Sequence, residues 1–181
     1  PPGLAVIVHV TTNSRLGYTD WDKFKAFVEH KDATWTLDAH DARGLPREGF
    51  GEVYSRYAKS LVAVGEGRGA DQSFGLETEI IAGLNPYTDD LSGGLPVTVT
   101  YQGAPRADAQ LEVFEKSPEG EVKVTLIRTD AEGRAIVPVR PGHRYMLDAV
   151  VLREPSPGLA AAENAVWESL WANLTFAVPA R

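Results

Sequence analysis

The chain has 181 residues, of which 43% are hydrophobic and 24% are charged, and its formal net charge at pH 7 is −7. This length and apolar content suffice to bury a sizeable core, which excludes a disordered chain. No run of Lys and Arg forms the basic surface of a nucleic-acid-binding protein, and no stretch reaches the roughly 20 apolar residues that a membrane-spanning helix needs. The chain has no cysteine, so disulfides, thiolate nucleophiles and zinc–thiolate sites are excluded.

Residues 1–65 combine one apolar segment with helical patterns. Leu4–Val10 is rich in β-branched residues and precedes a Thr-Thr-Asn-Ser turn, which predicts a buried strand. Asp20–His30 begins with a capping residue and carries aromatic side chains at helical spacing. Thr34–Ala42 is followed by the Gly and Pro that commonly end a helix. Both of these later segments are predicted to be helices.

The strongest helical periodicity lies in Glu48–Val64. Its apolar residues recur at i, i+3, i+4 and i+7, while Glu52, Arg56 and Lys59 face away from them. We therefore expect a third helix in this segment. The glycine-rich stretch Gly65–Gly69 follows it and marks the expected boundary between two domains.

The second half of the chain alternates short apolar runs with turn residues. Period-two alternation bounded by Gly, Pro and Asp is typical of half-buried strands. We expect an α+β fold, in which a helical segment over residues 1–65 packs beside a C-terminal immunoglobulin-like antiparallel β-sandwich over residues 70–181. The expected strands are Leu76–Ala82, Leu95–Tyr101, Gln110–Phe114, Val122–Thr129, Ala135–Val139, Tyr145–Leu152 and Leu170–Val178, and a short helical composition follows at Ala160–Ala165.

Five strings in the chain resemble one bacterial family. They are H-V-T-T-N-S-R-L at His9–Leu16, W-D-K-F-K-A-F at Trp21–Phe27, Y-S-R-Y-A-K-S-L-V at Tyr54–Val62, N-P-Y-T-D at Asn85–Asp89 and W-A-N-L-T-F-A-V-P at Trp171–Pro179. The family is the periplasmic domain-of-unknown-function family associated with nickel and cobalt uptake (NikM-like). The resemblance implies a periplasmic or secreted bacterial protein.

The same resemblance implies an N-terminal β-domain, a helical insertion and a C-terminal immunoglobulin- or transthyretin-like sandwich. Residues 1–65 would then hold a late strand of that first β-domain, whose earlier part is missing, and the insertion that follows it. The resemblance also implies a role beside transition-metal transport, with a transporter or envelope protein as partner. It transfers no metal ligand, because the His-containing stretch near the N-terminus of family members is not in this chain.

Four residues are candidate metal ligands on the basis of the sequence itself. His30 and His40 flank the second predicted helix with Asp38 close by, so an N/O site for nickel, cobalt or zinc would form if the helices turn back on each other. His9, in the first predicted strand, is the fourth candidate. The alternative interpretation makes His30 and His40 solvated helix-end residues and His9 a half-buried, hydrogen-bonded strand residue.

The other chemistry-bearing residues have ordinary structural explanations. Asp89 and Asp90 are better explained as turn-forming carboxylates than as calcium ligands, and Glu77 and Glu79 as two carboxylates on a solvated strand face. Aromatic residues at helical spacing favour a core over a ligand groove. No nucleophile-elbow or phosphate-loop motif occurs, so we expect no enzymatic activity.

These observations lead to two hypotheses. The first is a non-enzymatic periplasmic binding or accessory protein that holds or delivers a divalent metal through His and carboxylate groups. The alternative is a cell-envelope interaction module that binds a protein or polysaccharide through the sandwich and the aromatic helices, without metal. A metal carrier requires histidines clustered with carboxylates, whereas an interaction module is expected to have scattered histidines and an exposed aromatic patch.

Overall fold

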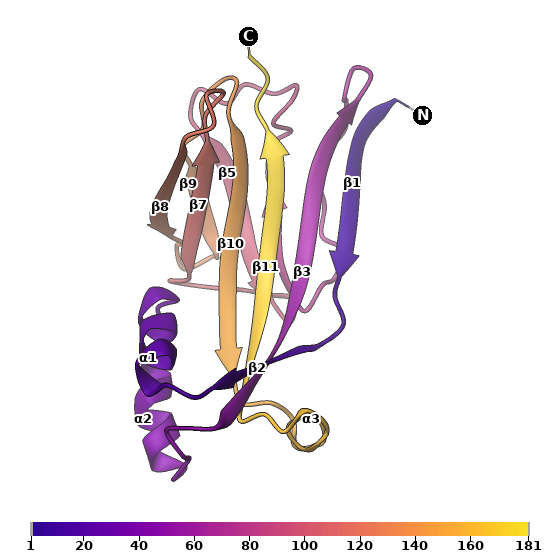
Figure 1. The fold of residues 1–181 in the computed structure, drawn as a ribbon. Helices are drawn as coiled ribbons and strands as arrows, with labels where there is room; N and C mark the ends of the chain where they lie inside the picture. Colours follow the sequence, from indigo (N-terminus) through magenta and orange to yellow (C-terminus); the bar gives the residue numbers. More distant parts are fainter. Residues whose placement is uncertain (1, 181) are drawn as a thin grey trace. The chain divides into compact units, whose positions relative to one another are not determined.

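The computed structural model describes residues 2–180 and is mostly β-sheet (Figure 1). The helices of this part of the chain are confined to short segments. The strands are β1 (Gly3–Val10), β2 (Ser14–Tyr18), β3 (Phe50–Val64), β4 (Thr78–Ala82), β5 (Leu95–Tyr101), β6 (Ala104–Pro105), β7 (Gln110–Lys116), β8 (Val122–Arg128), β9 (Arg134–Val137), β10 (Arg144–Arg153) and β11 (Trp167–Ala177), and the helices are α1 (Trp21–His30), α2 (Trp35–Ala42) and α3 (Pro157–Glu163).

The chain divides into two compact units that do not coincide with the predicted domains 1–65 and 70–181. The sandwich unit comprises Pro1–Val10, Arg56–Ala149 and Trp171–Arg181, and the helical unit comprises Thr11–Ser55 and Val150–Leu170. The long strands β3, β10 and β11 each contribute one part to both units. The boundary between the two units therefore crosses three strands and does not fall at a single point in the sequence.

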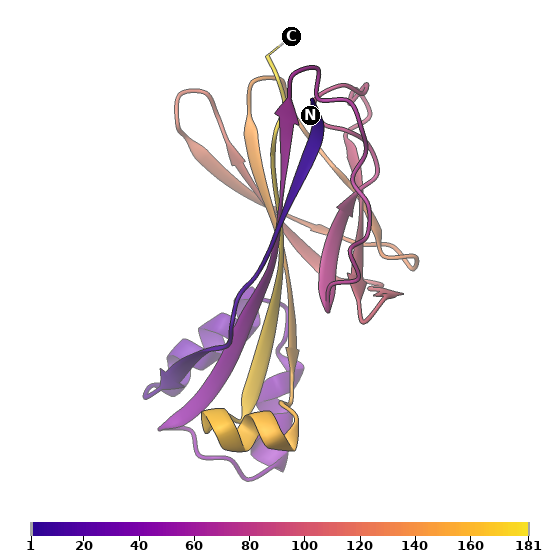
Figure 2. The same cartoon turned by 90° about the vertical axis from the view of Figure 1, so that its right-hand side faces the viewer.

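Two β-sheets form the layers of the sandwich unit. One sheet has the strand order β1-β3-β11-β10-β7-β8, with β2 added to β3, and the other has the order β4-β5-β6, with β9 also paired to β5. Figure 2 shows the layer of β4 and β5 apart from the larger sheet. The core between the layers is aliphatic, and its fully buried members include Leu95, Leu111, Leu147 and Leu174. The prediction of a C-terminal β-sandwich is confirmed at this level, although the arrows of neighbouring strands β3 and β11 run in the same direction (Figure 1).

The helical unit has an aromatic core. Asp20 caps α1 by accepting a hydrogen bond from the backbone N–H of Asp22 at 2.9 Å, as the sequence predicts. The α1 residue Phe24 is fully buried, and its ring lies 5.0 Å from that of Tyr18 and 5.1 Å from that of Phe50. These centroid distances and edge-to-face angles are typical of favourable ring contacts. The two predicted helices α1 and α2 are confirmed, and the aromatic side chains of α1 serve the core.

The prediction of a third helix is wrong, because residues 50–64 form β3. The segment is rich in β-branched and aromatic residues, which favour strands. Val53, Ser55, Lys59 and Leu61 lie on one strand face and are at most 5% exposed, and Tyr57 on the same face is half-buried, so this face is largely buried. Two of these four are polar, and their polarity hides the period-two pattern that would have identified a strand. Lys59, which was expected to face solvent, is 1% exposed.

The two outermost strands of the larger sheet are more exposed than expected. β1 pairs with β3 and ends the sheet on one side, and its Ile7 is 56% exposed, so the prediction of a buried strand is wrong here. β8 pairs with β7 and ends the sheet on the other side. Its Val122, Val124 and Leu126 are 61%, 48% and 54% exposed. The sandwich unit therefore presents apolar side chains on the surface of the larger sheet.

Candidate functional site

His40, the most central of the predicted metal ligands, is a core residue. It is 0% exposed, and its Nδ1 accepts a hydrogen bond from the indole N–H of Trp167 at 3.0 Å. An indole nitrogen only donates, so Nδ1 carries no proton and the proton of the neutral ring lies on Nε2. Nε2 in turn lies 3.0 Å from the carbonyl oxygen of Pro46 and donates to it. Both ring nitrogens are thus engaged within the protein, and the expectation of a solvated helix-end residue is wrong.

The other predicted ligands lie at the surface. His30 at the end of α1, Asp38 in α2 and His9 in β1 are exposed, so His9 is not the half-buried residue of the alternative interpretation. Among residues 2–180, no group of three or more His, Asp or Glu side chains is arranged to hold a metal ion. The structure does not bring His30, Asp38 and His40 together as a ligand set. A nickel, cobalt or zinc site stays a prediction.

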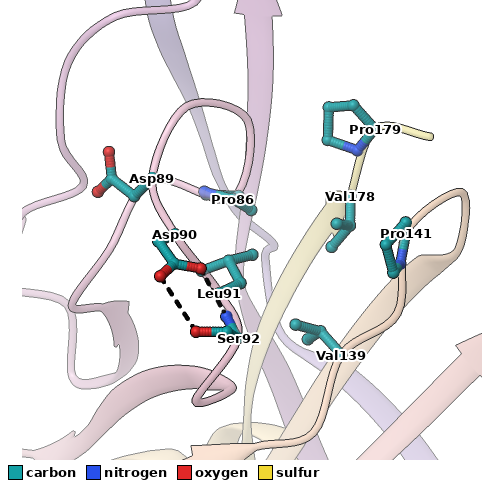
Figure 3. A pocket seen from close by; sticks show the side chains of 9 residues that line it. All are labelled: Pro86, Asp89, Asp90, Leu91, Ser92, Val139, Pro141, Val178 and Pro179. Atoms are coloured by element: carbon teal, nitrogen blue, oxygen red, sulfur yellow. Dashed lines mark hydrogen bonds between the residues drawn. The ribbon is translucent and has the colours of Figure 1, made fainter. Parts of the chain in front are cut away.

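The Asp89-Asp90 pair is explained by turn formation, as predicted. Asp89 accepts from the backbone N–H of Asn85 at 2.8 Å, and Asp90 accepts from the backbone N–H and hydroxyl of Ser92 at 2.9 and 3.1 Å. These side chains border a pocket of about 300 Å³ whose other lining is mainly Pro, Val and Leu (Figure 3). Figure 3 shows the Asp89 carboxylate pointing away from the apolar side chains. The pocket therefore offers no convergent set of polar groups.

A buried ion network stands where a solvated carboxylate pair was expected. Glu79 is 1% exposed, and its Oε1 lies 3.0 Å from the Nζ of Lys59. The Lys59 ammonium also lies 2.9 Å from Asp71 and donates to the carbonyl oxygen of Gln72 at 3.1 Å. Its three protons are thereby all used. The network anchors the loop between β3 and β4 to the sheet, and its charged groups are engaged with one another.

The helical unit contains a second buried carboxylate. Glu52 is 2% exposed and accepts hydrogen bonds from the hydroxyl of Tyr18 at 2.7 Å and from the hydroxyl of Ser169. Burial raises the pKa of Glu52 above its ordinary value, and the two hydrogen bonds oppose that rise. Burial and the neighbouring carboxylate raise the pKa of Tyr18 as well. Because all three side chains are buried, they fit a structural role better than acid–base catalysis.

The sandwich unit has a groove on the outer face of the larger sheet, the face turned away from the core. Tyr145 and Leu147 of β10 lie in the core, so Met146, which alternates with them, faces outward. The strand register places Met146 opposite Phe114, and Phe114 opposite Val124. We call this the outer-face groove. It has a volume of about 520 Å³ and is lined by Val62, Tyr87, Phe114, Val122, Met146 and Ala177 together with the cations Lys116 and Arg144.

Tyr87 opens the floor of the outer-face groove. Its hydroxyl donates to the carbonyl oxygen of Leu61 in β3 at 2.7 Å and accepts from the N–H of Ala177 in β11 at 3.3 Å. The Tyr87 hydroxyl therefore lies between a carbonyl oxygen of β3 and an N–H of β11, which would otherwise pair with each other directly as groups of neighbouring strands do. The core side chains Leu61 and Phe176 consequently contribute to the lining of the groove. The groove is a recess between strands and not only a flat patch.

The outer-face groove was missed in the sequence because it depends on strand register. The string V-K-V-T-L at Val122–Leu126 indicates a strand, but not that its apolar side chains face away from the core. Tyr87 lies in the string Asn85–Asp89, which was predicted to be a turn and gave no sign that Tyr87 contacts the sheet. Asn85 holds that loop in place, because it is fully buried and its amide donates to the carbonyl oxygens of Gly67 and Gly69.

Comparisons with known proteins place the chain in a family without assigning it an activity. No helix within residues 2–180 has the length and apolar character needed to cross a membrane. Comparisons with curated proteins and with solved structures gave no significant match. A family model described as a domain of unknown function (DUF4198) matches residues 8–153, and because this match covers most of the sequence, the chain belongs to the DUF4198 family.

Proposed function

We propose that the protein is a non-enzymatic binding module that holds an apolar ligand in the outer-face groove. The observation that carries the proposal is the row of outward-facing apolar side chains across strands β10, β7 and β8. Met146 and Val122, which line the groove, are 37% and 61% exposed, and Phe114 lies on the strand between them. Exposed apolar surface of this kind is costly in water and commonly marks a binding surface.

The depth of the groove supports a ligand site. A volume of about 520 Å³ lies within the range of about 300–1,000 Å³ that is typical of small-molecule sites. The opening made by Tyr87 lets the groove reach core side chains, which increases the apolar area that a ligand would cover. The buried carboxylates Glu79 and Glu52 are engaged by neighbouring groups, which favours a binding role over catalysis.

This proposal retains the interaction-module hypothesis but changes its surface. The aromatic side chains of α1 that were expected to contribute are in the core of the helical unit, where Phe24 is fully buried. The role in nickel or cobalt uptake and residence in the periplasm stay predictions, with no described site to support a metal.

Titration with phenylnaphthylamine, a neutral apolar dye whose fluorescence rises in apolar surroundings, tests the proposal. Met146→Asp places a charge on the floor of the groove at a side chain that is already 37% exposed, so the fold should tolerate it. We expect dye affinity to fall by about tenfold or more, since burying an unpaired charge costs well over the energy of a tenfold change. The matched control is Leu16→Asp, at a residue of β2 that is 46% exposed and outside the groove. Equal dye binding by both variants and the parent protein would refute the proposal.

A further inference from the structure

Two cations lie opposite each other at one end of the outer-face groove. The register of β7 and β10 places Lys116 directly across from Arg144, and both side chains are exposed and line the groove. Like charges at directly opposed positions of an antiparallel pair are destabilising. Within residues 2–180, neither side chain forms a hydrogen bond or an ion pair with another residue. No ion pair within the described residues therefore offsets the repulsion between these two charges.

The charge of the groove is opposite to that of the chain. The formal net charge of the protein is −7, yet Lys116 and Arg144 are the charged residues among those that line the groove. A groove with charges of one sign attracts ligands of the other sign. An anionic group placed between the ammonium and the guanidinium would remove their mutual repulsion and gain charge-assisted hydrogen bonds.

The apolar part of the groove extends away from these cations. From β10, which carries Arg144, the lining crosses β11 to Val62 of β3, a path of about 10 Å if each of two strand spacings is about 4.8 Å. Met146 lies along this path, and the recess beside Tyr87 lies near its far end. The groove thus combines a cationic end with a mainly apolar floor, in which the hydroxyls of Ser60 and Thr175 are hydrogen-bonded to each other at 2.6 Å.

We propose that the ligand of the outer-face groove is a single-chain anionic amphiphile of the long-chain carboxylate class. Its head group lies between Lys116 and Arg144, and its alkyl chain lies along Met146 toward Val62 and the Tyr87 recess. This inference rests on the proposed function, because it names the class of ligand that the same groove takes.

An alkyl chain suits this surface better than a polypeptide does. The backbone groups in the middle of a sheet are already paired to neighbouring strands, so a peptide laid across the face would leave its own N–H and C=O groups without partners. A peptide that pairs with a sheet does so at an edge strand. An alkyl chain has no polar groups to satisfy, and its narrow cross-section fits a recess between two strands.

Calorimetric titration of the whole chain with a matched series of amphiphiles tests the inference. The series is dodecanoate, neutral dodecyl maltoside and cationic dodecyltrimethylammonium, each kept below its micelle-forming concentration. We expect dodecanoate to bind most tightly and the cation most weakly. In the double variant Lys116→Gln/Arg144→Gln, dodecanoate affinity should fall by about tenfold or more while that of dodecyl maltoside is unchanged. The control Lys123→Gln removes a charge from the neighbouring strand β8, at a residue outside the groove lining, and should change neither affinity.

The outcomes separate this inference from the proposed function. If the neutral and anionic amphiphiles bind equally well, and the double variant binds both like the parent protein, the anionic ligand class is overturned and the apolar groove stands. If no amphiphile binds and Met146→Asp also leaves phenylnaphthylamine binding unchanged, both proposals fall. Binding to phosphatidylglycerol vesicles without binding to monomeric dodecanoate would identify a membrane surface as the ligand and would also overturn the inference.

Discussion

The two units of the chain bury polar groups in different ways. In the sandwich unit the core is mainly aliphatic, and one of its buried polar groups is the charged Lys59, which is held by Asp71 and Glu79. In the helical unit the core is aromatic, and one of its buried polar groups, besides Glu52, is a neutral His40 held by Trp167 and Pro46. An ion pair needs opposite charges to offset desolvation, whereas a neutral ring needs only correctly placed hydrogen bonds.

The units also differ in the surfaces that they present. α1 in the helical unit exposes charged side chains such as Asp22 and Lys25, which form an ion pair at 3.0 Å. The sandwich unit exposes Val122, Val124 and Leu126 together with an uncompensated pair of cations. A solvated helix surface needs no further partner, but an exposed apolar sheet face does. This difference is the reason why we propose the binding site in the sandwich unit.

The largest expected effect comes from breaking the ion network. Lys59→Met keeps the apolar stem but leaves the Asp71 and Glu79 carboxylates buried together without a cation. We expect the free energy of unfolding to fall by about 3–5 kcal/mol, measured by urea denaturation. Lys123→Met, at an exposed lysine of β8, is the control and should stay within about 0.5 kcal/mol of the parent protein. A loss below about 1 kcal/mol for Lys59→Met would show that the network is not needed for stability.

A smaller effect is expected from His40→Leu in the helical unit. Leucine has a similar size, but it leaves the indole N–H of Trp167 without an acceptor in a buried position. We expect a loss of about 1–3 kcal/mol in the free energy of unfolding, followed by tryptophan fluorescence. The exposed His30→Ala variant should be close to neutral.

The same variant tests the metal prediction. Both nitrogens of His40 are engaged, so any nickel, cobalt or zinc binding measured by calorimetry should be unchanged in folded His40→Leu. Loss of that binding in His40→Leu, with His30→Ala as the comparison, would contradict the core role and return His40 to the metal site.

How far the sequence predicts each unit depends on where the partners of a residue lie. Most sandwich strands were predicted, because alternation along the chain directly reflects one buried face, as in β5 at Leu95–Tyr101. β3 was not, because Lys59 occupies a buried position and its partner carboxylates come from a loop and another strand. The role of His40 was equally hidden, since Trp167 lies 127 residues away along the chain.

The candidate site shows the same limit. Most of the apolar strings that form the outer-face groove are visible in the sequence as strands, but Val62 lies in β3, which was predicted to be a helix. Their shared orientation depends on the register that sets Met146 opposite Phe114, and the cation pair depends on the register that sets Lys116 opposite Arg144. Register is a tertiary property, fixed by burial of the opposite face and by turn geometry. Sequence patterns therefore predicted most of the strands that line the groove, but not the groove itself.

Each unit has a tyrosine whose hydroxyl donates a hydrogen bond to a carboxylate. Tyr145 in the sandwich unit donates to Glu115, and Tyr18 in the helical unit donates to Glu52. Burial raises the pKa of Tyr145 to about 12, and burial with the Glu52 charge raises that of Tyr18 further. Because the pKa of each tyrosine is higher in the folded state than in the unfolded state, keeping the hydroxyl protonated stabilises the fold. For Tyr145 this contribution is fully present below the ordinary pKa of about 10 and is lost as the pH rises toward the folded-state value of about 12.

Ultraviolet absorbance of tyrosinate in the folded chain measures this difference. We expect Tyr145→Phe to remove a transition near pH 12, and Tyr18→Phe to remove none below that pH. Circular dichroism confirms that the chain is still folded at each pH. A Tyr145 transition near pH 10 in the folded protein would contradict the buried hydrogen-bonded environment described for it.

The smallest expected losses of stability come from removing the carboxylate of a helix cap and the carboxylate of a turn between strands. Asp20 in the helical unit accepts one backbone hydrogen bond, from Asp22. Asp130 in the sandwich unit accepts two, from the backbone N–H groups of Glu132 and Arg134 at 3.0 and 2.8 Å. Asp20→Ala should therefore lower the free energy of unfolding by about 1 kcal/mol, and Asp130→Ala by up to about 2 kcal/mol.

Replacement by asparagine distinguishes lost hydrogen bonds from lost charge. Asparagine keeps an oxygen acceptor at the same place, so Asp20→Asn and Asp130→Asn should recover most of the stability that alanine removes. If asparagine were as destabilising as alanine at Asp130 only, the carboxylate charge would matter there. Arg134→Gln would then test the guanidinium of the residue whose backbone N–H donates to Asp130. If asparagine recovered stability to the same extent at both positions, the exposed carboxylates of both units would act in the same way, as acceptors for backbone N–H groups. The two units would then differ in how they bury polar groups and not in how they use exposed carboxylates.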